Sequence, residues 1–110
     1  MAYDEELAFR VRAILDDADG ISEKAMFGGL AFLLNGNMAV AVSSRGGLMA
    51  RLTPELAADL LGEPGVSPFE MRGKAIAGWL RVEPAVIEED ADLRVWVDRC
   101  VEFAGSLPAK

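Results

Sequence analysis

The chain of 110 residues contains no histidine and a single cysteine, Cys100. Without histidine it lacks the usual general base near neutral pH and the commonest metal ligand. A serine triad, a Cys–His pair and the common zinc sites are therefore excluded. No GxGxxG motif links a strand to a helix, so nothing indicates a dinucleotide or methyl-donor site. We expect no enzyme, no catalytic residue, no metal and no cofactor.

Basic residues and long apolar runs are also scarce. The chain has 11 Lys and Arg against 18 Asp and Glu, a net charge of −7. We expect no direct nucleic-acid binding, because phosphate neutralisation supplies most non-specific affinity. No apolar run approaches the roughly 18 residues of a membrane span, and the acidic N-terminus is unlike a signal peptide. With one cysteine no internal disulfide forms, so we expect a cytoplasmic protein that makes no membrane contact.

The charge is unevenly distributed along the chain. Residues 1–23 carry two basic and seven acidic groups, and residues 82–110 carry three basic and seven acidic groups. Residues 24–81 carry six basic and four acidic groups, so this middle part is slightly positive. The acidic ends have helical patterns, whereas the middle is mostly strand-like.

The stretch 26–38 predicts strands separated by a glycine break and a tight turn. An apolar run, Leu30–Leu34, is bounded by turn residues and favours a strand. Asn35-Gly36 predicts a two-residue type I′ turn, which Asn37 could lengthen by one residue. Alternation then predicts Met38, Val40 and Val42 on one face and Ala39 and Ala41 on the other. At Gly28-Gly29 we favour a bulge or bend over a close approach to a ligand.

The remaining patterns complete a single domain, 1–110. Helices are predicted over 4–17, from the N-cap Thr53 and Pro54 to Gly62 with Leu56, Leu60 and Leu61 buried, and over 88–107. Strands are predicted over 22–27, 29–34, 38–43, 48–52, 69–71 and 75–82, with a loop at 63–68. In the last strand Ile76, Gly78, Leu80 and Val82 are predicted to share one side. These elements predict an α+β, two-layer fold: an antiparallel sheet of five to six strands with helices on one face, in the order α-β-β-β-β-α-β-β-α.

Two other groups have ordinary structural interpretations. Cys100 lies on the apolar stripe of the last helix, which favours a buried and unreactive thiol. The acidic run Glu88-Glu89-Asp90 stands at the start of the same helix, where it complements the helix dipole.

The sheet face without helices is the candidate interaction face. Alternation directs Ala39, Ala41, Met49, Arg51, Trp79 and Arg81 outward, and the turn with Arg72 and Lys74 adds a basic spot. Small apolar groups, an indole and guanidinium groups are typical of protein interfaces. The alternatives are a solvated face on which Arg81 pairs with Glu70 or Glu83, and a stacking platform for single-stranded nucleic acid.

Met26-Phe27-Gly28-Gly29, continued by Ala31-Phe32 and Asn35-Gly36-Asn37-Met38, resembles the N-terminal domain of the TfoX/Sxy proteins. Agreement continues at Met71-x-Gly73, Gly78-Trp79, Trp96-Val97, Phe103-Ala104 and Ser106-Leu107-Pro108, so that the similarity covers Tyr3 to Lys110. The resemblance implies a two-layer domain with an antiparallel sheet and a role in transcription of bacterial competence genes. Full-length members act with an activator of the cyclic-AMP-receptor type and carry a C-terminal helical domain, which this sequence lacks.

Three functional hypotheses follow. The first is a non-enzymatic protein-interaction module that acts through a transcription regulator. The second is a small-ligand sensor or minor enzyme, with a pocket between the Pro64–Pro68 loop and the sheet. The third is a homodimer joined through the outer sheet face or its edge.

Overall fold

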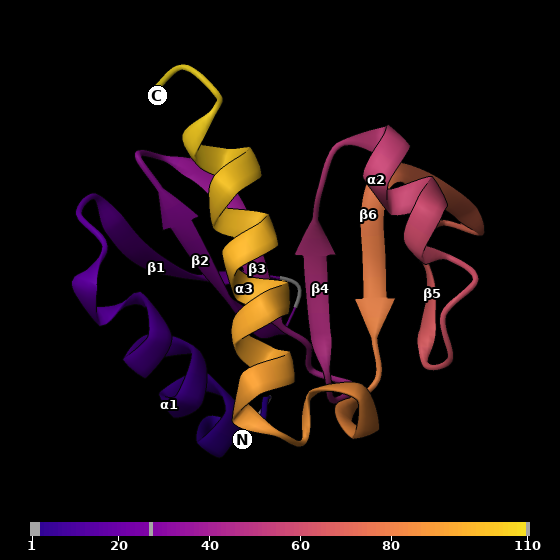
Figure 1. Cartoon of the computed structure of the whole chain (residues 1–110), viewed down its shortest axis with the longest axis horizontal. Coiled ribbons are helices and arrows are strands. Elements are labelled where there is room, and N and C mark those ends of the chain that lie inside the picture. Colours follow the sequence, from indigo (N-terminus) through magenta and orange to yellow (C-terminus); the bar gives the residue numbers. More distant parts are fainter. Residues whose placement is uncertain (1–2, 27, 110) are drawn as a thin grey trace.

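The computed structural model describes residues 3–26 and 28–109 of the chain (Figure 1). Within these residues, six strands form one antiparallel sheet in the order β1-β2-β3-β4-β6-β5, accompanied by three α-helices and two short 3₁₀ helices. The helices are α1 (Glu5–Ile14), η1 (Leu15–Asp17), α2 (Pro54–Leu60), η2 (Pro84–Ile87) and α3 (Asp90–Gly105). The strands are β1 (Ile21–Met26), β2 (Gly29–Leu34), β3 (Asn37–Val42), β4 (Leu48–Arg51), β5 (Val66–Met71) and β6 (Lys74–Val82).

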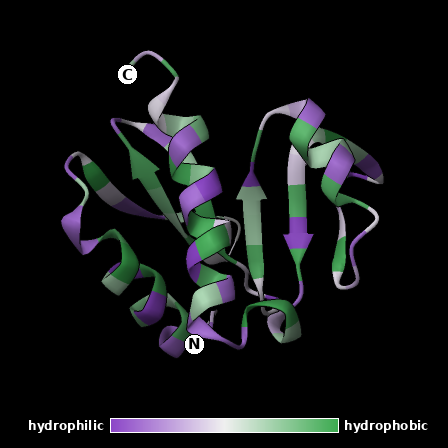
Figure 2. Ribbon diagram, in the orientation of Figure 1, coloured by the Kyte–Doolittle hydropathy of each residue, from purple (hydrophilic) through white to green (hydrophobic). Residues whose placement is uncertain are grey.

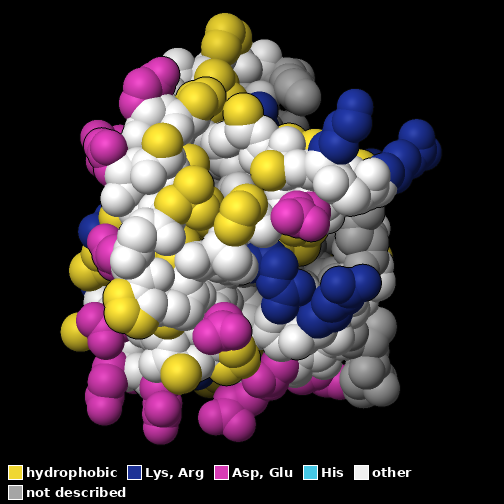
Figure 3. Space-filling model, turned by 90° about the vertical axis from the view of Figure 1, so that its right-hand side faces the viewer, with side chains coloured by type: hydrophobic (Ala, Val, Ile, Leu, Met, Phe, Trp, Pro, Cys, Tyr) yellow, Lys and Arg dark blue, Asp and Glu magenta, His cyan; other side chains and the backbone are white. Residues whose placement is uncertain are grey.

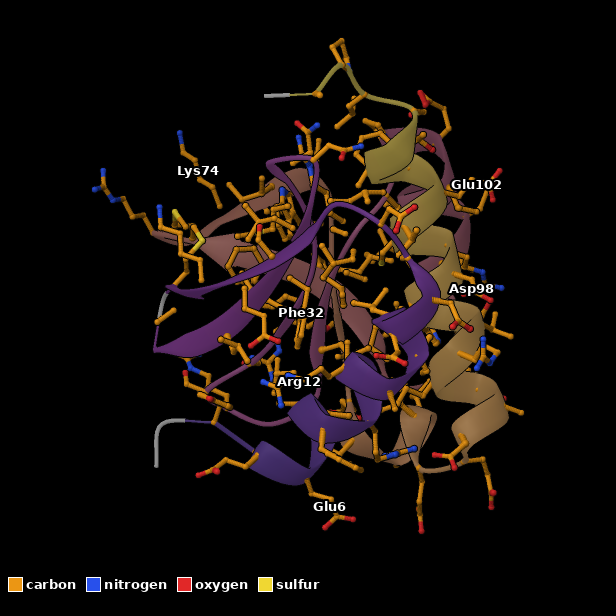
Figure 4. The ribbon with its side chains drawn as sticks, turned by 90° about the vertical axis from the view of Figure 1, so that its left-hand side faces the viewer. Glu6, Arg12, Phe32, Lys74, Asp98 and Glu102 are labelled. Carbon is orange, nitrogen blue, oxygen red and sulfur yellow. The ribbon has the colours of Figure 1, made fainter. Side chains whose placement is uncertain are left out.

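The predicted α+β fold, with its antiparallel sheet and its order of elements, is confirmed. In Figure 1, α1 and α3 lie side by side over one face of the sheet, and α2 lies beside β6. Figure 4 shows the same two layers from one end of the sheet, with the helices on one side of the strands. We call the opposite face of the sheet, which these helices leave uncovered, the outer face.

The main core fills the space between the sheet and the helices. In Figure 2, α3 alternates hydrophobic and hydrophilic residues around its axis, as an amphipathic helix does. Its apolar side chains meet those of the strands, and the largest fully buried ones are Phe32, Leu48, Leu52, Leu80, Ile87 and Leu93. Burial of these side chains supplies the main driving force for folding.

The first and last helices are shorter than predicted. The helix predicted over 4–17 is observed as α1 followed by η1, and Asp4 is its N-cap, accepting hydrogen bonds from the backbone N–H groups of Glu6 and Leu7. The helix predicted from residue 88 begins at Asp90, after the short helix η2. The strand predicted over 22–27 is observed as β1, and Phe27 lies outside the described residues.

The second helix begins as predicted but ends earlier. The Thr53 hydroxyl oxygen accepts a hydrogen bond from the backbone N–H of Leu56, which caps the first turn. The helix ends at Leu60, so Leu61 lies in the following turn. Leu61, which we predicted to be buried, is therefore 40% exposed.

The turn between β2 and β3 is the predicted Asn-Gly turn. Asn35 and Gly36 have φ angles of 52° and 84°, as a two-residue type I′ turn requires. Asn37 is the first residue of β3 and pairs with Leu34. The loop therefore has two residues, and Asn37 does not lengthen it to three.

A β-bulge makes the predicted outward direction of Ala39 wrong. The register between β2 and β3 shifts between Phe32 and Leu33, which interrupts the alternation of side chains. Ala39 therefore lies with Val40 in the main core, whereas Met38 packs on the outer face. The bulge exchanges the faces that we predicted for Met38 and Ala39.

The sheet edge formed by β5 differs from the prediction because a proline lies inside a strand. β5 begins at Val66, whereas we predicted its start at Phe69, after Pro68. Proline is tolerated there because β5 is an edge strand and leaves some backbone N–H positions without a partner.

β6 is irregular opposite Phe69. The register between β5 and β6 shifts between Pro68 and Glu70, and Gly78 has a φ angle of 85°. The strand bends at this glycine, but the burial along β6 still alternates as predicted: Ile76 is half-buried and Gly78 is buried, whereas Ala75 and Ala77 are exposed. Of the four residues predicted to share one side, Leu80 and Val82 lie in the main core, and Ile76 and Gly78 line a hollow together with Ala57 of α2.

Candidate interaction face

Paired residues cross the outer face from one strand to the next. Residues opposite each other in neighbouring strands share a face of the sheet. From β1 to β5, the row is Lys24, Ala31, Ala41, Met49, Arg81 and Ser67. Charged side chains therefore flank a centre of small and apolar ones.

A second hydrophobic cluster covers the middle of this face. Its buried members are Ala31, Ala41 and Met49, and partly buried side chains pack around them: Met26, Leu33, Met38, Phe69 and Trp79. We call this set the outer apolar cluster. Three of its members are methionines, whose flexible side chains adapt to irregular partners.

A hollow of about 550 Å³ adjoins the cluster where β4, β6 and β5 lie together. The β3–β4 loop lines it with Ser43, Ser44 and Arg45, the strands β4 and β6 add Met49 and Arg81, and the remaining wall is 68–72. We call it the arginine hollow. Figure 3 shows basic side chains gathered on this side of the molecule, whereas most acidic ones follow the helix side and the lower end.

The structure brings only part of the predicted site together. Met49, Arg72 and Arg81 line the arginine hollow. Trp79 lies beside it, packed against Phe69 with ring centroids 6.1 Å apart and planes tilted by 50°. Lys74 extends into solvent away from α3 (Figure 4) and does not line the hollow.

The hollow also contains residues that the sequence analysis missed. Arg45 was treated as a turn residue, and residues 68–70 were divided between a loop and a strand. Arg45 and Arg72 lie on loops 27 positions apart in the sequence, and only the folded chain places both on the wall of one hollow. The predicted pocket beside the Pro64–Pro68 loop is displaced, since only Pro68 of that segment lines the hollow.

The arginines of the hollow have no acidic partner within 4 Å among residues 3–26 and 28–109. The ion pairs in that part of the chain are Arg10–Asp90 at 3.0 Å and Arg12–Glu23 at 2.6 Å, and neither includes a residue that lines the hollow. The expected alternative in which Arg81 pairs with Glu70 or Glu83 is therefore not observed.

Arg51 lies in a fork of the sheet, apart from the hollow. The pairing of β3 with β4 ends at Val40 and Ala50, so the two strands separate beyond this point. The Arg51 guanidinium donates a hydrogen bond of 3.3 Å to the backbone oxygen of Met38. It also lies 5.9 Å from the ring centroid of Trp79 and 5.4 Å from that of Phe103, within the range of cation–π contacts. Arg51 thus fills the fork and links the sheet to α3.

Cys100 is buried beneath this fork, as predicted. Burial raises the pKa of its thiol to about 12, against a weaker opposing effect of a hydrogen bond with the Arg51 backbone. We expect no reaction with a thiol reagent such as DTNB in the native protein at about pH 8, and one equivalent of reaction after unfolding in guanidinium. Rapid reaction of the native protein, measured at 412 nm, would contradict this burial.

The described part of the chain shows no cluster of three or more His, Cys, Asp or Glu residues placed to hold a metal ion. None of its helices is both long and apolar enough to cross a membrane.

Residues 13–104 match the sequence profile of the TfoX N-terminal domain. The chain belongs to the TfoX N-terminal domain family. No curated protein and no solved structure matches it. The family is consistent with a competence-related regulatory module.

The double glycine of this TfoX N-terminal domain has a packing reason. A side chain at Gly29 would overlap the backbone oxygen of Val42, so only glycine allows β2 and β3 to approach here. Gly28 has a φ angle of 76°, in the left-handed region that favours glycine. Gly28 lies in the turn between β1 and β2, whose register shows no bulge, so the two glycines serve a turn and a close strand contact in place of the bulge or bend that we predicted.

Proposed function

We propose that this TfoX N-terminal domain is a non-enzymatic protein-interaction module of the bacterial cytoplasm that acts on transcription through a protein partner. The partner docks on the outer apolar cluster. The observation that carries this proposal is the position of that cluster, on the sheet face that no described helix covers. The surface that it offers to a partner comes from its partly buried members, Met26, Leu33, Met38, Phe69 and Trp79, and apolar surface gathered on one face marks interaction sites in soluble proteins.

Charge supports the same assignment. In the row of paired residues across the outer face, Lys24 on β1 and Arg81 on β6 flank the apolar centre. They are separated by four strand spacings, about 19 Å. A partner with acidic groups around an apolar patch would complement this arrangement, and matching potentials increase both the association rate and the specificity.

The decisive experiment replaces one apolar side chain on each face of the molecule. Leu33→Glu places a charge in the outer apolar cluster, whereas Val95→Glu places one on α3, where Val95 is already 47% exposed. Cross-linked complexes would be purified from bacterial lysate and identified by mass spectrometry. We expect a transcription activator or polymerase subunit with the native chain and with Val95→Glu, and at least about tenfold less with Leu33→Glu.

Two outcomes would contradict the proposal. One is equal recovery of transcription proteins by Leu33→Glu and the native chain, when circular dichroism shows both folded. The other comes from sedimentation: a native dimer that Leu33→Glu converts to a monomer would make the outer face a contact between two copies of this chain.

A further inference from the structure

We propose that the arginine hollow binds a nucleoside monophosphate as a free small molecule. This goes beyond the proposed partner interaction and does not depend on it. The hollow, at about 550 Å³, has the size of a small-molecule site. Its lining contains arginines, which can bind a phosphate group, and an apolar floor formed by Met49 and Phe69, on which an aromatic base can stack.

The phosphate end of the ligand is assigned to the arginines. The lining contains three arginines and one glutamate, a local charge of +2 in a chain whose net charge is −7. Arginine presents a planar fork of donors that matches two oxygens of one phosphate group. Since these guanidinium groups have no acidic partner within 4 Å among the described residues, their donors are available to a ligand.

The supporting backbone holds two of these arginines on ordered segments. Arg81 projects from the paired part of β6, directly beside Met49. Arg45 lies two residues after Ser43, whose hydroxyl oxygen accepts a hydrogen bond of 3.1 Å from the Arg45 backbone N–H. A second bond of 3.0 Å, from the Ser43 N–H to the backbone oxygen of Gly47, closes the loop.

Arg72 occupies a conformation that arginine rarely adopts. Its φ angle is 56°, and with Gly73 at 79° it forms the tight turn between β5 and β6. Glycine is favoured at such a position because it has no Cβ to crowd the following carbonyl oxygen, and asparagine because its short polar side chain forms local hydrogen bonds. Strain of this kind is concentrated at functional sites, where the side chain itself is needed.

The base end of the ligand is assigned to the floor. Phe69 and Met49 line it, and Trp79 packs against Phe69. Aromatic side chains stack on every base with little preference for its identity. Glu70 accepts hydrogen bonds from ribose hydroxyls or base amino groups and disfavours the additional charge of a diphosphate or triphosphate.

The test uses the fluorescence of Trp79 in the full chain. Trp79 is half-buried beside the hollow, whereas the second tryptophan, Trp96, is buried in the main core and supplies a constant signal. The probes are AMP, GMP, CMP and UMP, with adenosine and inorganic phosphate as controls. We expect saturable quenching by at least one nucleotide with a dissociation constant of about 0.1–1 mM, and binding of adenosine or phosphate weaker by about tenfold or more.

Three variants locate the site. Arg81→Gln removes one phosphate contact and is expected to raise the dissociation constant about tenfold. Arg72→Asn has a similar effect and keeps the turn, because asparagine tolerates the left-handed conformation. The matched control is Arg94→Gln, which changes an exposed arginine on α3 and leaves binding unchanged.

Three results would overturn the proposal. They are no quenching by any nucleotide up to about 10 mM, equal affinity for inorganic phosphate and for the nucleotides, and equal weakening by Arg94→Gln. Leu33→Glu is expected to bind nucleotide normally, so failure of this inference and failure of the partner interaction are separate results.

Discussion

Phe32→Ala is expected to lower the free energy of unfolding by about 3–5 kcal/mol. The ring is 0% exposed, and it lies between the sheet and the helix layer (Figure 4). Alanine would leave a cavity in the main core, because neighbours such as Val40, its partner across β2 and β3, are held by strand pairing. Urea denaturation followed by circular dichroism measures the change.

Phe9→Ala is the matched control for this core substitution. Phe9 is 67% exposed on α1, so the same chemical change is expected to alter stability by no more than about 0.5 kcal/mol. Similar losses from the two variants would show that Phe32 does not pack as the structure places it.

Gly29→Ala is expected to cost about 3 kcal/mol or to prevent folding. The new Cβ would overlap the backbone oxygen of Val42 and crowd the backbone nitrogen of Ser44 at 3.3 Å. These are backbone atoms of the neighbouring chain segment, so relief requires β2 and β3 to separate at this end. Thermal and urea unfolding compare the variant with the native protein.

Gly62→Ala serves as the control for this glycine. A Cβ at Gly62 meets nothing within 4 Å. We expect no loss of stability and a gain of up to about 1 kcal/mol, because alanine restricts the unfolded chain. A tolerated Gly29→Ala would refute the packing reason given for the double glycine.

The sequence predicted best where one local signal determines the structure. Asn35-Gly36 specifies a tight hairpin turn through its positive φ angles, and Thr53 caps α2 with its own hydroxyl group. Such signals act within a few residues and need no knowledge of the rest of the fold. The alternating pattern of the strands is also local, and it correctly predicted that Ala41 and Met49 lie on the outer face and not in the main core.

The errors arise where tertiary structure interrupts a local pattern. Counting by twos along β3 misplaced Ala39, because one extra residue in a bulge reverses the faces. Pro68 was taken as the end of a loop, although an edge strand accommodates it. The bulge in β3 and the position of Pro68 within a strand both depend on how neighbouring strands pair. The local residue pattern did not indicate either feature.

The arginine hollow could be predicted only in part. Met49 and Arg81 follow from strand alternation, and Arg72 from its turn. Arg45 joins them only in the folded chain, where the β3–β4 loop and the β5–β6 turn line the same hollow. One signal in the sequence could have drawn attention to Arg72. It is an arginine directly before Gly73 in a tight turn, at a position that favours asparagine.

The fork between β3 and β4 also bears on synthesis at the ribosome. The hairpins of β1–β3 join neighbouring segments and can form early, and the strands β4–β6 with α2 make a second local unit. Phe103 and Cys100 of α3 close the seam between these halves, and they leave the ribosome after both halves. Until then the nascent chain contains two half-sheets whose apolar faces are not yet covered by α3. Exposed apolar surface of this kind is what chaperones bind.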